Sequence, residues 1–86
     1  MWKIHYQQQP VKFLKKLDNP TKEKILDYLE KILTAKNPKI FGKALSANLT
    51  GLWRYRVGDY RIICDIRQKE LIILVIDIGH RKNIYR

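Results

Sequence analysis

The chain is short, apolar enough to fold and strongly basic. Its 86 residues suit one small domain, and because 45% of them are apolar we expect a packed globule over residues 1–86. Eighteen Lys and Arg against eight Asp and Glu give a net charge of +10, which favours nucleic acid, an anionic membrane surface or an acidic protein as the partner. No apolar run approaches the roughly 20 residues of a membrane-spanning helix, and no secretory signal is evident, so we expect a cytoplasmic protein. The single cysteine, Cys64, excludes an internal disulfide and a multi-cysteine metal site.

The first half of the chain has the pattern of one strand followed by two helices. Residues 2–7 alternate apolar and polar side chains, which is typical of a half-buried strand. From Pro10 onwards apolar residues recur at three- and four-residue spacing, which predicts a helix. Asn19 is expected to cap a second helix that has the following proline at its first position, and residues 37–38 (Asn-Pro) are expected to end it. Residues 39–51 are predicted to form a loop.

Three further strands are predicted in the second half. Residues 52–57 and 60–66 form a hairpin around Gly58-Asp59, a two-residue turn with glycine at its first position. After a turn at residues 67–69, residues 71–78 are almost continuously apolar, which is typical of a central strand covered on both faces. The order β-α-α-β-β-β predicts an α+β fold in which a helical hairpin packs on one face of a mostly antiparallel sheet.

Three arginines fall on one face of the predicted hairpin. All six arginines follow residue 52, whereas ten of the twelve lysines precede it. The two-residue turn places Arg56 opposite Arg61, with Arg54 diagonal to Arg61. Like charges directly opposite each other destabilise a sheet, so such a cluster favours a bound anion, and a guanidinium binds phosphate in a bidentate manner. A solvent-exposed face without a ligand would give the same pattern.

The segment after the last strand carries groups that suit RNA chemistry. His80, Arg81 and Tyr85 bring an imidazole, a guanidinium and a phenol into six residues. Histidine transfers protons near neutral pH, arginine stabilises a crowded phosphate, and tyrosine stacks on a base. Histidine beside arginine is common on protein surfaces, so the segment favours RNA only in combination with the three arginines.

Two motifs carry a resemblance to a known family. The motif R-x-R-V-G-D-Y-R at residues 54–61 and the motif G-H-R-K-x-x-Y at residues 79–85, together with Gly42 to Leu45 and the preceding elements, resemble the RelE toxins of the RelE/ParE toxin–antitoxin superfamily. The resemblance covers almost the whole chain. It implies a prokaryotic toxin that cleaves messenger RNA, typically in the ribosomal A site, without a metal or other cofactor. It also implies an acidic antitoxin as partner, which we expect to cover the arginines or to displace residues 79–86.

The resemblance further implies a reaction and a site. In such enzymes the 2′-hydroxyl of the RNA attacks the adjacent phosphorus and leaves a 2′,3′-cyclic phosphate and a 5′-hydroxyl. Arg54 matches a basic strand position, Arg61 matches the arginine that holds the scissile phosphate, and Arg81 matches the arginine that stabilises or protonates the departing oxygen. Tyr85 matches a tyrosine that stacks on or orients the substrate, and His80 lies where relatives have lysine or histidine. The further RNA-binding candidates are Lys43, Arg56 and Lys82.

The sequence departs from the family pattern in two ways. Leu52 stands where some relatives have a first strand lysine, and no glutamate occupies the position of a carboxylate base. The proton acceptor is therefore open between His80, a water held by Tyr85, and Lys43. Two other functions stay open as well: a ParE-like toxin that acts on DNA gyrase through protein contacts, and a catalytically inactive homologue that binds RNA or an antitoxin.

Overall fold

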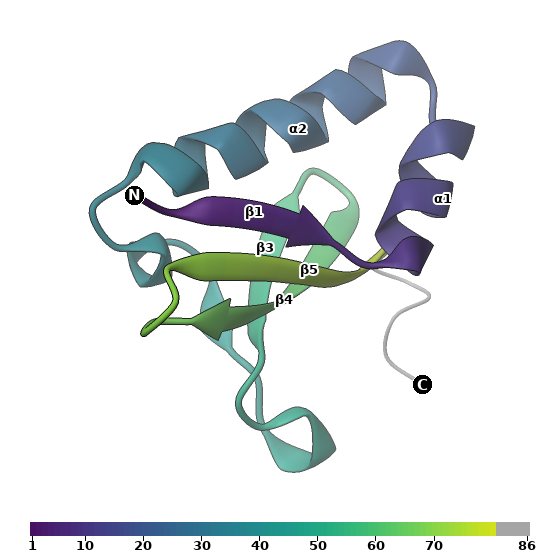
Figure 1. Cartoon of the computed structure of the whole chain (residues 1–86). Coiled ribbons are helices and arrows are strands. Elements are labelled where there is room, and N and C mark those ends of the chain that lie inside the picture. The colour runs from purple at the N-terminus through teal and green to yellow at the C-terminus, as the bar shows by residue number, and fades with distance from the viewer. Residues whose placement is uncertain (81–86) are drawn as a thin grey trace.

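The computed structural model describes residues 1–80 of the chain. In this part, two helices lie over one face of a single sheet (Figure 1). The elements in chain order are β1 (Lys3–Tyr6), α1 (Gln8–Lys16), α2 (Asn19–Thr34), η1 (Pro38–Ile40), β2 (Lys43–Ala44), η2 (Ala47–Leu49), β3 (Trp53–Val57), β4 (Tyr60–Arg67) and β5 (Ile72–His80), where η denotes a short 3-10 helix. The predicted α+β fold is confirmed. None of the helices within residues 1–80 is long and apolar enough to span a membrane.

The strands lie in the order β1-β5-β4-β3-β2. The predicted meander is present, since β3, β4 and β5 pair antiparallel in succession. The first strand, β1, pairs parallel with β5, so β5 is an interior strand of the sheet, as predicted. The last strand runs from Ile72 to His80, two residues further than residues 71–78.

The helices begin earlier than the sequence analysis predicted. Helix α1 starts at Gln8, two residues before Pro10. A proline is tolerated in the first turn of a helix because the N–H that it lacks would have no partner within the helix. Helix α2 starts at Asn19, and its cap is Asp18, so the assignment of Asn19 as the cap is wrong. The Asp18 carboxylate accepts hydrogen bonds from the Thr21 amide at 3.1 Å and the Thr21 hydroxyl at 2.9 Å. A side chain one residue further on would lie inside the first turn and could not reach that amide in this way.

The predicted loop at residues 39–51 contains a short edge strand, β2, which pairs with β3. Two residues are too few to show an alternating pattern, so the sequence did not predict this strand. Gly42, with φ +73°, lets the chain approach β3 closely, because a Cβ atom here would collide with the backbone oxygen of Arg54. Two aromatic side chains of β3 fasten the segment: Trp53 Nε1 donates to the Phe41 oxygen at 2.6 Å, and the Tyr55 hydroxyl donates to the Pro38 oxygen at 2.8 Å.

The core lies between α2 and the sheet. Its members with no exposed surface are Ile25, Ile32, Tyr55, Ile62, Cys64, Ile73, Val75 and Ile78. The prediction that the last strand is covered on both faces is wrong, because Ile72 and Leu74 lie on the opposite face and are partly exposed. The helices thus cover one face of the sheet, and we call the other the open face.

A β-bulge interrupts the pairing of β4 with β5. The adjacent residues Ile63 and Cys64 pair with Asp77 and Val75, so Ile76 has no direct partner on β4. One inserted residue reverses the alternation of side chains between the two faces beyond it. The core positions of β5 on either side of the bulge, Val75 and Ile78, are therefore three residues apart.

Candidate active site on the open face

The β3–β4 hairpin has the predicted register. Val57 pairs with Tyr60 across the two-residue turn, Arg56 pairs with Arg61, and Arg54 pairs with Ile63. Because directly paired residues share a face and alternate residues along a strand share it too, the three arginines lie together on the open face. The sequence prediction that these arginines are brought together is confirmed.

Lys43 extends this cluster across β2, where it pairs with Arg54. We call Lys43, Arg54, Arg56 and Arg61 the arginine face. Arg54 is partly buried, and its Nε atom finds no hydrogen-bond partner among residues 1–80. Repulsion between cations on neighbouring strands destabilises the sheet, so this arrangement favours binding of a polyanion.

At the opposite end of the open face, an arginine is paired with a carboxylate. There Arg67 Nε lies 3.1 Å from Asp65 Oδ2 and forms an ion pair with it. The two side chains are two residues apart on β4, and both are substantially exposed. Arg67 therefore has an acidic partner on its own strand. It lies outside the arginine face, although it shares β4 with Arg61.

A carboxylate lies beside the arginine face. Asp77 of β5 pairs with Ile63 of β4, which in turn pairs with Arg54 of β3, so all three share the open face. Among residues 1–80, Asp77 makes no hydrogen bond or ion pair. Burial raises the pKa of the Asp77 carboxyl above its ordinary value. Sequence analysis did not select this residue, although a lone acid within an apolar strand is a signal that could have done so.

His80 does not lie on the arginine face. It pairs with Tyr60, one residue beyond the Arg61–Gly79 pair, and so belongs to the helix-covered face. Its ring meets the Tyr60 ring edge-on with centroids 5.5 Å apart, and Tyr60 meets Phe13 of α1 in the same way at 6.0 Å. The expected grouping of this imidazole with the arginines is therefore corrected, and the cause is the bulge, which reverses the alternation along β5.

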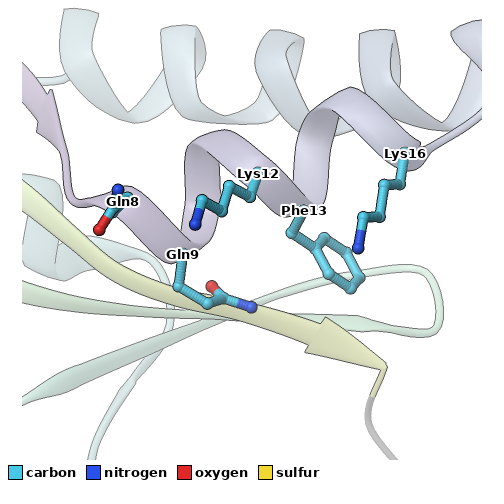
Figure 2. Close-up of a pocket in the computed structure, with 5 residues that line it drawn as sticks. All are labelled: Gln8, Gln9, Lys12, Phe13 and Lys16. Carbon is cyan, nitrogen blue, oxygen red and sulfur yellow. The ribbon is translucent and has the colours of Figure 1, made fainter.

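Helix α1 holds the end of β5 through a side-chain amide. Gln9 Nε2 donates to the Ile78 oxygen at 2.8 Å, and the Ile78 amide donates to Gln9 Oε1 at 2.9 Å. In Figure 2 the Gln9 side chain extends from α1 to β5. It lies at a hollow of about 400 Å³. The hollow is lined by Gln8, Gln9, Lys12, Phe13 and Lys16. It includes none of the predicted site residues, and the sequence gave no reason to expect the Gln9 contact.

Three predicted site residues, Arg81, Lys82 and Tyr85, lie outside the described residues. Their assigned roles remain predictions. Lys43, Arg54, Arg56 and Arg61 are brought together, and their contact with RNA is likewise a prediction at this point.

The comparisons with known structures define the class of fold. The chain matches the toxin–antitoxin complex RelBE2 of Mycobacterium tuberculosis with a TM-score of 0.83 and 21% identity, over 95% of this chain and 93% of that one. It matches the archaeal RelE–RelB complex of Pyrococcus horikoshii OT3 with a TM-score of 0.74 and 23% identity, over 95% and 97% of the two chains. YafQ of E. coli strain BL21(DE3) matches with a TM-score of 0.66 and 20% identity over 100% of both chains. The fold is that of the RelE-like toxins.

The sequence identifies the family. The model of the family described as ParE toxin of the type II toxin–antitoxin system parDE matches residues 4–85. No protein with a curated description matches the sequence significantly. The chain belongs to this toxin family of the RelE/ParE superfamily, and the resemblance inferred from the two motifs is confirmed.

Proposed function

We propose that this chain is the toxin of a type II system and acts as an endoribonuclease that cleaves messenger RNA in the ribosomal A site. The observation that carries the proposal is the arginine face, where Arg54, Arg56 and Arg61 lie side by side on two paired strands. The likeness of residues 54–61 and 79–85 to the RelE motifs supports the choice of RNA as substrate.

In the proposed reaction the 2′-hydroxyl of one nucleotide attacks the adjacent phosphorus. The bond from phosphorus to the 5′-oxygen breaks, and the products are a 2′,3′-cyclic phosphate and a 5′-hydroxyl. The crowded phosphorus of the transition state carries extra negative charge, which fixed guanidinium groups stabilise without the need to reorganise solvent. Arg61 holds the scissile phosphate, and Arg54 adds positive charge from the neighbouring strand.

The remaining predicted residues bind around this phosphate. Lys43 and Arg56 contact the flanking RNA backbone through their positive charge. Beyond the described residues, Arg81 stabilises or protonates the departing 5′-oxygen, Lys82 contacts the backbone, and Tyr85 stacks on a base. His80 lies on the other face of the sheet, so in this proposal it does not remove the 2′-hydroxyl proton.

An acidic antitoxin is the proposed protein partner. The net charge of +10 attracts an acidic chain, and the relatives from M. tuberculosis and P. horikoshii were solved in complexes with their antitoxins. An antitoxin that folds as it binds can cover the arginine face or displace residues 79–86, and either mode would block RNA.

The proposal is tested by primer extension on messenger RNA from cells that express the toxin without an antitoxin. Codon-positioned breaks are expected with the wild type. Arg61→Ala or Arg81→Ala should remove both the breaks and the growth inhibition, because loss of one such charge costs about a hundredfold in rate, on the order of 3 kcal/mol. Arg67→Ala, which alters an arginine of the same strand outside the arginine face, should still cleave.

A gyrase-directed toxin is the second candidate, and the match to the ParE family model favours it. That function predicts DNA damage with intact messenger RNA in the same cells. Full toxicity of both Arg61→Ala and Arg81→Ala would also contradict the nuclease assignment.

A further inference from the structure

The bulge in β5 turns a carboxylate out of the core. In a regular strand the side chains of residues 73, 75 and 77 would share one face, and residues 73 and 75 are buried beneath the helices. Because Ile76 is the inserted residue, Asp77 instead lies on the open face, and Ile78 takes the next core position. Bulges that redirect one side chain occur next to active sites more often than elsewhere.

The carboxylate lies next to the proposed phosphate site. Gly79 pairs directly with Arg61 and has no side chain, so within residues 1–80 no side chain of β5 stands opposite Arg61 on the open face. Asp77 is two residues before Gly79 on the same face, so it is the diagonal neighbour of Arg61, a pair that is typically separated by about 7–8 Å. A phosphate contacting Arg61 over Gly79 would place the ribose that carries it within reach of Asp77.

The groups around Asp77 leave its carboxylate available. On the open face of the neighbouring strands, the charged or titratable groups are Arg61, Asp65 and Arg67 of β4 and Lys3 and His5 of β1, with Arg54 and Arg56 one strand further. Asp65 is engaged by Arg67, whereas Asp77 has no polar partner among residues 1–80.

We propose that Asp77 is the proton acceptor of the cleavage reaction; this inference rests on the proposed function. As the bond from the 2′-oxygen to phosphorus forms, the 2′-hydroxyl proton moves to the Asp77 carboxylate. The bond to the 5′-oxygen breaks, that oxygen receives a proton from Arg81 or water, and the proton that Asp77 then releases to solvent replaces the one that was donated. No proton is consumed overall.

Asp77 suits this role better than the acceptors considered from the sequence. His80 lies on the helix-covered face. Lys43 lies on β2, two strands away from β4, whereas Asp77 lies on the strand next to β4. Because neighbouring strands are about 4.8 Å apart, the backbone of Lys43 is farther from Arg61 than that of Asp77. Burial raises the pKa of Asp77, which brings the carboxylate closer to the range in which a general base is effective.

The test is single-turnover cleavage of a defined messenger RNA on ribosomes by the purified full chain. Asp77→Asn keeps the size of the side chain and removes the base, so its rate should fall at least about a hundredfold with RNA affinity equal to or tighter than that of the wild type. The rate of the wild type should rise with pH through the pKa of Asp77, and this rise should be absent in Asp77→Asn. Asp65→Asn is the matched control, and it should keep both the rate and the pH profile.

Two further measurements separate the possible outcomes. A substrate with sulfur in place of the bridging 5′-oxygen expels its leaving group without an acid, so Asp77→Asn should stay slow on it if Asp77 is the base. Urea unfolding should show Asp77→Asn folded and, above the Asp77 pKa, at least as stable as the wild type, because no unpaired carboxylate remains. If Asp77→Asn cleaves within a few-fold of the wild-type rate and with the same pH profile, the assignment of Asp77 as the proton acceptor is refuted and the proposed function still stands. Intact RNA with the wild type would refute the proposed function, and the role of Asp77 with it.

Discussion

Gly42 sets how closely β2 lies against β3, and Gly42→Ala should therefore be strongly destabilising. The residue has φ +73°, a left-handed conformation that costs a residue with a side chain about 1–2 kcal/mol. The added methyl group would overlap the backbone oxygen of Arg54 and lie 2.8 Å from the Tyr55 ring and 2.9 Å from Trp53 Nε1. A backbone atom cannot rotate away, so β2 must shift, at an overpacking cost of about 1–3 kcal/mol. The total loss is about 2–5 kcal/mol.

Gly58→Ala is the matched control. Gly58 also has a positive φ, +58°, but no atom lies within 4 Å of the position of an added methyl group. Its substitution should cost only the conformational part, about 1–2 kcal/mol. Urea unfolding measures both variants, and a domain of this size loses about 4–8 °C of Tm per kcal/mol. If the two variants lose the same unfolding free energy to within about 0.5 kcal/mol, which is the usual scatter between independent sites, the argument that a methyl group at Gly42 collides with β3 is refuted.

Two other predictions concern buried groups. Tyr55→Phe should cost about 1–2 kcal/mol of unfolding free energy, because it removes the hydrogen bond to the Pro38 oxygen and leaves that oxygen unpaired. Tyr28→Phe is the control, since the Tyr28 hydroxyl makes no such bond within the described residues, and equal losses in the two variants would contradict the prediction. Burial raises the pKa of the Cys64 thiol to about 12, so the native protein should not react with a disulfide reagent at pH 8 and should react fully in guanidinium chloride. Rapid reaction of the native protein would show that β4 opens readily.

The arginine cluster was predictable because a two-residue turn fixes the register of a hairpin. Once Gly58-Asp59 is identified as the turn, counting outwards pairs Arg56 with Arg61, and the structure has this pairing. The two helices were predictable from their apolar spacing, but their first residues were not. Both Asp18 and Asn19 are good capping residues, and the choice between them depends on which side chain reaches the Thr21 amide.

The position of His80 was not predictable, because it depends on a single inserted residue. A bulge leaves no mark in a strand that is apolar on both sides of it, as β5 is around Ile76. The same insertion moves Asp77 to the open face, so one local feature determines the faces on which both His80 and Asp77 lie. The amide contact from Gln9 to Ile78 joins residues 69 positions apart and is invisible to any local pattern.

The most direct test of the account is to determine the RNA ends produced by the purified toxin and by Arg61→Ala. If the arginine face holds the scissile phosphate, the wild type yields 2′,3′-cyclic phosphate and 5′-hydroxyl ends, and Arg61→Ala forms them about a hundredfold more slowly while its unfolding curve stays close to that of the wild type. Undiminished cleavage by a folded Arg61→Ala variant, or ends of any other chemistry, would contradict the account.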